Sequence, residues 1–433
     1  MTQGRLSAKG MGIPNLPYAV HPGHLNLATI EQVQANAAGI MLDQVIEGLT
    51  VQPPEARPAK EPGLRDIVFE GTFEEVNEFF YDREWSEGLP IVPPTVAKVE
   101  RFLQFTERPA DAVLGALLPD NREATVWNVA VNGVMAGCRP EYMPVLLAIV
   151  EAMADPEFGQ EHLGHTPGTE TLIIINGTII KDLEFNYTQG ALRPGFLANT
   201  SIGRFWRLYL RNVAGFLPHK TDKGCFGSNF RVVLAENEDA VASMGWEPLS
   251  VDQGFQAGDD VVTITSCTEK TQAIEVGAPT AEQILRNIEA RMADNHLFIQ
   301  FFFRGMRTRP TIVLTPAVLK VLTDAGYTKA MVKQHFYEHA RLKVSRLSGM
   351  IVDRFYKGID AGNWPEQLGT SRDLNRYIQM VSCPDDFLIV VSGDADRDHV
   401  LICANNGYIG YPVSKRIQLP SNWEELLRTA KRT

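Results

Sequence analysis

Three arginines mark one helical segment as a candidate anion site. In "LANTSIGRFWRLYLRNVAGF", residues 197–216, Arg204, Arg207 and Arg211 follow one another at steps of three and four. This spacing places the three guanidinium groups on the same face of a helix. A guanidinium fork matches the geometry of a carboxylate or a phosphate. Either the stripe binds an anionic ligand, or it pairs with carboxylates of the protein itself.

Small polar residues precede the stripe. Thr200 or Ser201 can cap the first turn and leave backbone N–H groups free to bind an anion. Arg204 is the arginine nearest that end of the helix. Asn176 lies in "TLIIING", where it follows a buried strand at its carboxyl end. The predicted substrate-binding residues are Asn199, Ser201, Gly203, Arg204, Arg207 and Asn176.

Two cysteines stand next to cations, which lower the pKa of a thiol when they lie close to it in space. Cys138 precedes Arg139 in "AGCRPEY", and Cys225 follows Lys223 and a glycine in "KGCFGSN". Both are predicted as catalytic thiols. The other three cysteines, Cys267, Cys383 and Cys403, lie in or beside strand patterns and are expected in the core.

Histidines offer an alternative, metal-dependent chemistry. "EHLGH" holds His162 and His165, and "HFYEH" places His335 and His339 four residues apart on a helix. That second spacing suits two ligands on one helical face, although the glutamate of a zinc-protease motif is missing after the first histidine. A metal-dependent hydrolase or lyase therefore stays an alternative. The principal interpretation includes no metal.

Composition limits the possible partners. The chain has 433 residues, 44% of them hydrophobic and 21% charged, and its net charge is −11. That charge argues against a nucleic acid or an anionic membrane as the main partner. No apolar run reaches the roughly 18–20 residues that span a bilayer. The five scattered cysteines favour free thiols in the cytoplasm.

The alternation of helical and strand patterns predicts a mixed α/β (α+β) fold. Residues 1–50 contain one expected strand (16–21) and one helix capped by Thr29, and such a βα unit cannot bury a core alone. A proline-rich linker over 51–65 leads to a central α/β domain over 66–276. A smaller C-terminal α/β domain is expected over 277–433. Expected strands include 66–72 and "DDVVTITSC", and a capping box of Thr72 and Glu75 is expected to start the helix that follows the first of them. The two patterns "DFLIVVSG" and "HVLICA" are candidates for neighbouring strands.

The segments "EWSEGLPIVPPT", "NGVMAGCRPEYMPVLLAIVEAM" and "ANTSIGRFWRLYLRNVAG" resemble proteins associated with the UGSC family of (seleno)proteins, named for a Sec/Cys-Gly-Ser-Cys motif. Residues 1–50 resemble the C-terminal tail of the UGSC domain, yet the chain contains no UGSC or CGSC motif. The resemblance implies that a partner subunit with this motif docks on residues 1–50. It also selects His165 and Glu141 as the acid–base candidates.

These observations together predict a subunit of a hetero-oligomeric cytosolic enzyme that acts on an anionic small molecule. The resemblance implies thiol- or selenol-dependent cleavage, formation or reduction at a carbon–heteroatom bond. No glycine-rich phosphate loop or dinucleotide motif occurs, so no nucleotide cofactor is expected and any other cofactor is left open. A non-catalytic scaffold that positions the partner is the remaining alternative.

Overall fold

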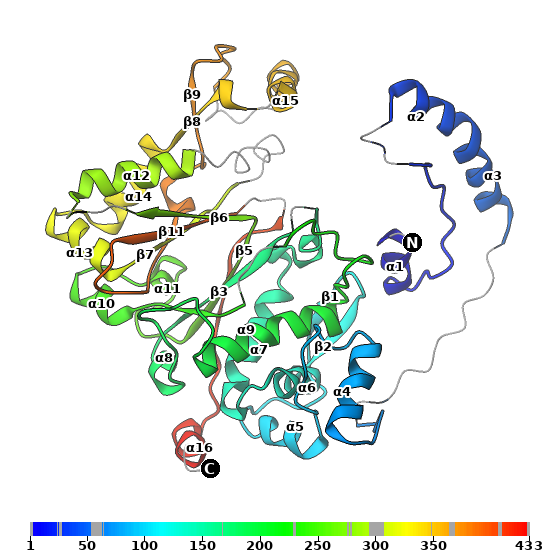
Figure 1. Ribbon diagram of the computed structural model, residues 1–433, viewed down its shortest axis with the longest axis horizontal. Helices are drawn as coiled ribbons and strands as arrows, with labels where there is room; N and C mark the ends of the chain where they lie inside the picture. Colours follow the sequence, from blue (N-terminus) through cyan, green and yellow to red (C-terminus); the bar gives the residue numbers. More distant parts are fainter. Residues whose placement is uncertain are drawn as a thin grey trace.

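The computed structural model describes most of the chain (Figure 1). The described residues are 3–23, 25, 28–52, 63, 65–166, 168–227, 231–274, 277, 279–293, 307–347, 349–362, 369–405 and 409–430. Most of the predicted linker 51–65 lies outside them. The mixed α/β class is confirmed, because helices and several small sheets alternate along the chain.

The helices are α1 (Gln3–Gly10), α2 (Ile30–Asn36), α3 (Leu42–Thr50), α4 (Phe73–Asp82), α5 (Val96–Leu103), α6 (Val126–Ala136), α7 (Met143–Met153), α8 (Ile179–Asp182), α9 (Leu197–Tyr209), α10 (Glu238–Ser243), α11 (Leu249–Asp252), α12 (Ala281–Ala293), α13 (Pro316–Asp324), α14 (Lys329–His339), α15 (Gly349–Asp360) and α16 (Trp423–Ala430). The strands are β1 (Val113–Leu117), β2 (Arg122–Thr125), β3 (Glu170–Asn176), β4 (Leu234–Ala235), β5 (Val261–Cys267), β6 (Glu269–Ile274), β7 (Thr311–Leu314), β8 (Arg341–Lys343), β9 (Tyr377–Gln379), β10 (Leu388–Val391), β11 (His399–Ala404) and β12 (Val413–Arg416).

Two four-stranded sheets pack face to face, and each carries helices on its outer face (Figure 1). Side chains of a strand alternate between its two faces. In β3, Leu172 and Ile174 enter the core between the sheets, whereas Ile173 packs in the core with α6, α7 and α9. In β7, Val313 faces the other sheet, and Ile312 packs with α12–α14. The result is four layers: helices, sheet, sheet, helices.

The strand orders are β12-β5-β3-β4 in the first sheet and β10-β7-β11-β6 in the second. The expected pairing of "DFLIVVSG" with "HVLICA" is wrong, because β7 lies between β10 and β11 and bonds to both. Strand β5 leads into β6 through Thr268 and so carries the chain from the first sheet to the second. Strand β12 and α16 return to the first sheet and its helices. The expected division at 276/277 therefore does not follow the sheets.

The N-terminal residues form an arm outside these layers. Thr29 and Gln32 make the expected capping box at the start of α2. A π-helical turn, Ala37–Met41, connects α2 to α3. The expected strand at 16–21 is not formed; the segment runs beside α3, and the Val20 N–H donates to the Gln44 side chain at 2.6 Å. A strand needs a neighbour to bond with, and no strand lies beside this segment in the described residues.

The segment that precedes α4 also departs from expectation. Residues 66–72 were expected as a strand, but the described backbone there has no strand pairing and Ile67 is 70% exposed. The capping box of Thr72 and Glu75 at the start of α4 is confirmed. The local cap signal was sufficient to place the helix, whereas strand formation required a partner from elsewhere in the chain.

Candidate functional site

Helix α9 begins earlier than the sequence indicated. Its N-cap is Phe196, which has no side chain able to cap, so Thr200 and Ser201 lie inside the helix. The Thr200 N–H donates to Phe196 O at 2.9 Å, and Ser201 Oγ donates to Leu197 O at 2.7 Å. The expected cap at Thr200 or Ser201 is therefore wrong. The Thr200 N–H and the Ser201 hydroxyl instead donate hydrogen bonds to backbone carbonyls at the start of α9.

Asn199 and Gly203 fasten α9 to its neighbours. The buried Asn199 amide donates to the carbonyls of Asn186 and Val233, at 3.0 and 2.9 Å, and accepts from Asn186 N–H at 2.8 Å. At Gly203, an added Cβ would lie 2.4 Å from the carbonyl oxygen of Arg231. Both residues were predicted to bind substrate. In the structure, Asn199 connects α9 to the segments of Asn186 and Val233, and Gly203 is where α9 lies against the backbone of Arg231.

Two arginines of the stripe bind the protein itself. Arg204 donates from Nε to Glu87 Oε1 at 2.6 Å and from Nη2 to Pro90 O at 2.7 Å. Arg211 Nε donates to Glu84 O at 2.5 Å. These bonds attach the loop that contains "EWSEGLP" to the face of α9. For these two residues the structure favours pairing within the protein over ligand binding.

Arg207, between them, has most of its hydrogen-bonding capacity unused. Its side chain is 38% exposed, and within the described residues its one hydrogen bond joins Nη1 to Glu170 Oε1 at 3.3 Å. A guanidinium offers five N–H donors. Glu170 opens β3, and its side chain is only 5% exposed. Burial raises the pKa of Glu170 to about 7, and Arg207 opposes that rise.

Two loops bring His165 and Cys225 to the same region. The Lys223 N–H donates to Gly164 O at 2.8 Å, and the Cys225 N–H donates to Thr166 O at 2.9 Å. These two bonds fix the backbone of the Cys225 loop alongside His165. Cys225 itself is exposed. Two of the predicted catalytic residues, far apart in sequence, therefore lie on adjoining loops.

Asp222 connects these loops to Glu170. It lines a small cavity of about 10 Å³ together with Glu170 and Arg207. Burial lowers the pKa of His165 to about 4, and His162 adds to this while Asp222 opposes it. His165 is thus neutral at pH 7, and its pKa is far from that of an efficient acid or base at neutral pH. The pKa of Glu170, about 7, is closer to the value that an efficient acid or base has at neutral pH.

Cys138 lies apart from this region, immediately after α6. Its thiol is buried, and burial raises its pKa to about 12. Ser201 and Arg204 lower that pKa, but their effect is smaller than that of burial. At neutral pH Cys138 is therefore a protonated, inert thiol, and the expectation of a reactive thiolate has no support from its surroundings.

Glu141 contributes to a separate cavity. This cavity has a volume of about 700 Å³ and lies between α5, α16 and the short helix that precedes α7. Arg101, Arg139 and Glu184 also line it, and the Arg139 guanidinium is 3.9 Å from Glu141. Glu141 and His165 therefore do not share a site.

Asn176 lies at the carboxyl end of β3, as expected, but it serves a buried polar network. Its Nδ2 donates to Glu236 at 2.7 Å and to Glu238 at 2.8 Å. Glu236 also accepts from the Leu249 N–H and the Val391 N–H. This network joins the first sheet to the second at the end of β3.

Three of the four histidines proposed as metal ligands, His162, His335 and His339, lie beside carboxylates. His335 bonds to Glu289, and its ring lies 4.5 Å from that of His339. His162 is 3.8 Å from Glu161. In the described part of the chain, no three or more His, Cys, Asp or Glu side chains are grouped in a way that would hold a metal ion.

Comparisons of the chain with protein-family models, curated proteins and solved structures find no match. No helix among the described residues combines the length and the apolar character needed to cross a membrane.

The candidate functional site is therefore the region of Glu170, Arg207, Asp222, His165 and Cys225. It offers a cation that makes a single hydrogen bond to the described part of the chain, a carboxyl group that titrates near neutrality and an exposed thiol. Sequence reasoning missed Glu170, although a glutamate at the start of the apolar strand "ETLIIIN" was the available signal. A charged residue at such a position is buried with the strand.

Proposed function

We propose that this chain is one subunit of a heteromeric enzyme that acts on an anionic small molecule. The reaction would be a thiol- or selenol-dependent cleavage, formation or reduction at a carbon–heteroatom bond. A partner chain with a UGSC or CGSC motif would dock on residues 1–50 and supply the reactive thiol or selenol. The chain described here would supply the anion-binding cation and the acid–base group.

The main support for the proposal is the exposed apolar face of helix α3 in the N-terminal arm. Leu42, Val45, Ile46 and Leu49 are spaced at 0, 3, 4 and 7 residues along α3 and so share one helical face. All four are exposed, Leu49 by 82%. Neither α2 nor α3 has a buried residue. A helix with such a face is normally stabilised by packing it against another element.

The neighbouring extended segment supports a partner with an open sheet edge. The sequence of residues 16–21 predicts a strand, but no strand lies beside this segment in the described structure. A partner domain that lacks its last strand and helix would provide both a sheet edge for 16–21 and a core for α3. The resemblance of residues 1–50 to the UGSC tail is the reason for proposing a UGSC-type chain as this partner.

The chemistry rests on Arg207 and Glu170. Arg207 makes one hydrogen bond within the described residues, which leaves N–H donors there for a carboxylate or phosphate, and Glu170, with its pKa near 7, is suited to moving a proton. Cys225 is the exposed thiol on the adjoining loop. A substrate that lies over Arg207 would be within the region to which all three belong.

Co-expression with candidate partner chains, followed by native mass spectrometry, tests the proposal. The interface variant is Leu42→Glu/Leu49→Glu, which places charges on the apolar face of α3. Glu47→Lys is the control, because it changes charge on α3 outside that face. We expect the wild type and the control to capture a chain with a UGSC or CGSC motif, and the interface variant to lose it.

Activity of the assembled complex separates the alternatives. We expect Arg207→Gln and Glu170→Gln to lower turnover at least about tenfold without loss of assembly. If neither change affects turnover, the chain is a scaffold and the catalytic assignment is wrong. The metal-dependent alternative would be favoured if the chain forms a homo-oligomer, binds none of the candidate partners and contains stoichiometric metal.

A further inference from the structure

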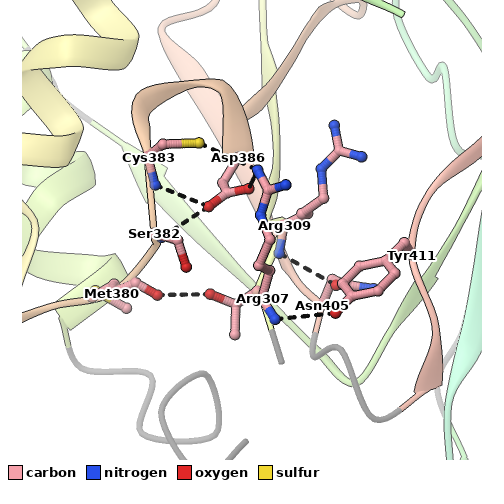
Figure 2. A network of polar contacts seen from close by, with 9 residues as sticks. Arg307, Arg309, Met380, Ser382, Cys383, Asp386, Asn405 and Tyr411 are labelled. Atoms are coloured by element: carbon pink, nitrogen blue, oxygen red, sulfur yellow. Dashed lines mark hydrogen bonds and ion pairs between the residues drawn. The ribbon is translucent and has the colours of Figure 1, made fainter. Parts of the chain in front are cut away.

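Cys383, expected in the core, has surroundings unlike those of the other cysteines. It is partly exposed and precedes the short 3-10 helix Pro384–Asp386. Its sulfur accepts a hydrogen bond from Arg307 Nη2 at 3.2 Å and another from the backbone N–H of Asp386 (Figure 2). One of the two donors is a cation. Donors of this kind stabilise a thiolate more than a thiol.

Asp386 holds this arrangement in place. Its side chain is fully buried, and one carboxylate oxygen accepts from the N–H groups of Ser382 and Cys383 at 2.8 and 3.0 Å. The other oxygen pairs with Arg307 (Figure 2). The charge of Asp386 is thus neutralised by Arg307, and the backbone on either side of Cys383 is fixed. The thiol is held rigidly next to the guanidinium group.

A second guanidinium, that of Arg309, has no partner among the described residues. Its backbone N–H donates to Asn405 Oδ1 at 3.3 Å, but its side chain has no hydrogen bond or ion pair with any described residue, and its Nε is buried. In Figure 2 the Arg309 guanidinium points away from Asn405 and Tyr411, the Arg307 guanidinium is drawn between it and Cys383, and no contact is drawn to it.

Burial lowers the pKa of Arg309, and Asp386 and Cys383 are among the groups that act on it electrostatically. The exposed Glu157 also acts electrostatically on Arg309, but it forms no ion pair with it. A buried donor without a partner costs free energy. A bound anion would supply that partner.

We propose that Cys383 is a reactive thiol and that Arg309 selects small anionic disulfides for it. The Cys383 thiolate attacks one sulfur of R–S–S–R, a Cys383–S–S–R bond forms, and the original S–S bond breaks to release R–S⁻. The Cys383 sulfur is oxidised and the released sulfur is reduced. Arg309 binds a carboxylate of the incoming R group. This inference does not depend on the proposed function.

Thiol modification of the full chain tests the proposal, with Cys225 as the internal comparison. Cys225 is more exposed, but no described donor reaches its sulfur. We compare Cys225→Ser, which retains Cys383, with Cys383→Ser, which retains Cys225. The probes are the dianionic disulfide dithiobis(nitrobenzoate) and the dicationic disulfide cystamine, with rates from intact-protein mass and sites from peptide mapping.

With the dianionic probe, we expect Cys383 to react about tenfold faster than Cys225. In the Cys225→Ser background, Arg309→Gln should lower the rate with the dianion about tenfold and change the rate with cystamine much less. Arg309→Lys should restore part of the preference. Because the Arg309 side chain has no described partner, neither substitution breaks a bond that supports the fold.

Two results would overturn the proposal. If Cys383 reacts no faster than Cys225, the thiol is not activated. If Arg309→Gln leaves the ratio of the two rates unchanged, Arg309 does not recognise the anion. Added salt provides an independent check, because screening should slow the reaction of the dianion at Cys383 and not that of cystamine.

Discussion

Arg204 on α9 and Glu87, which lies 117 residues earlier in the chain, form an ion pair with an Nε–Oε1 distance of 2.6 Å. The same guanidinium also binds the carbonyl oxygen of Pro90. Arg204 thus fixes the "EWSEGLP" loop on the helix. Arg207, one turn further along, makes one hydrogen bond among the described residues, to the buried Glu170 at 3.3 Å.

We expect Arg204→Gln to lower the free energy of unfolding by about 2 kcal/mol, since it leaves Glu87 and a backbone carbonyl without their cation in a largely buried place. Arg207→Gln should cost less than about 1 kcal/mol, because among the described residues that side chain makes one hydrogen bond, and this bond is long, at 3.3 Å. Urea denaturation of both variants measures the difference. Equal costs for the two would contradict the structural role given to Arg204.

The raised pKa of Glu170 makes stability depend on pH. Between the ordinary pKa of 4.5 and about 7, the folded protein holds a proton on Glu170 that the unfolded chain releases. The contribution of this group therefore falls as pH rises through that window, by about 3 kcal/mol.

Glu170→Gln cannot ionise, so the stability of this variant relative to wild type should rise by up to that amount between pH 4.5 and 7. Denaturation at several pH values measures it, with Glu78→Gln, the same substitution at an exposed position, as the control. A difference between Glu170→Gln and wild type that is independent of pH would refute the assignment.

Gly203 should tolerate no side chain. The Cβ of Gly203→Ala would lie 2.4 Å from Arg231 O, so α9 would have to move away from the 231–233 segment. We expect a loss of about 2–3 kcal/mol in the free energy of unfolding. Gly39→Ala is the matched control, since its Cβ would meet nothing within 4 Å. This control should be neutral or slightly stabilising, and equal losses at both positions would exclude a steric cause.

Cys138 should resist alkylation. Its pKa of about 12 leaves only about one molecule in ten thousand as thiolate at pH 8, and burial blocks access to it. Iodoacetamide should label Cys138 only after denaturation, as measured by peptide mass spectrometry, while Cys225 is labelled in the folded protein. Labelling of native Cys138 at the rate of Cys225 would restore it as a candidate nucleophile.

Local signals in the sequence predicted most helix starts and the buried strands. The capping boxes at Thr29 and Thr72 are present, and "TLIIING" and "DDVVTITSC" form β3 and β5. A cap depends on residues three apart, and a buried strand depends on a short apolar run. Both are therefore contained within a few consecutive residues.

The predicted site is only partly reproduced because its residues depended on distant neighbours. Asn199 and Gly203 were recognised as unusual, but their partners, Asn186, Val233 and Arg231, could not be identified from spacing. Cys383 was assigned to the core because a strand pattern follows it. The position of Arg307 beside its sulfur follows from the packing of two segments 76 residues apart.

Sequence patterns alone indicated a mixed α/β protein with an arginine stripe on one helix and an N-terminal unit too small to have a core. Periodicity and composition act over one or two turns of helix, so they suffice for these conclusions. The packing of distant segments sets which arginine lies beside the buried Glu170, which carboxyl group titrates near neutrality and which thiol accepts a hydrogen bond from a guanidinium group. Those properties depend on desolvation and on charges brought together from distant segments, because the strength of an electrostatic interaction is set by distance in space and by burial.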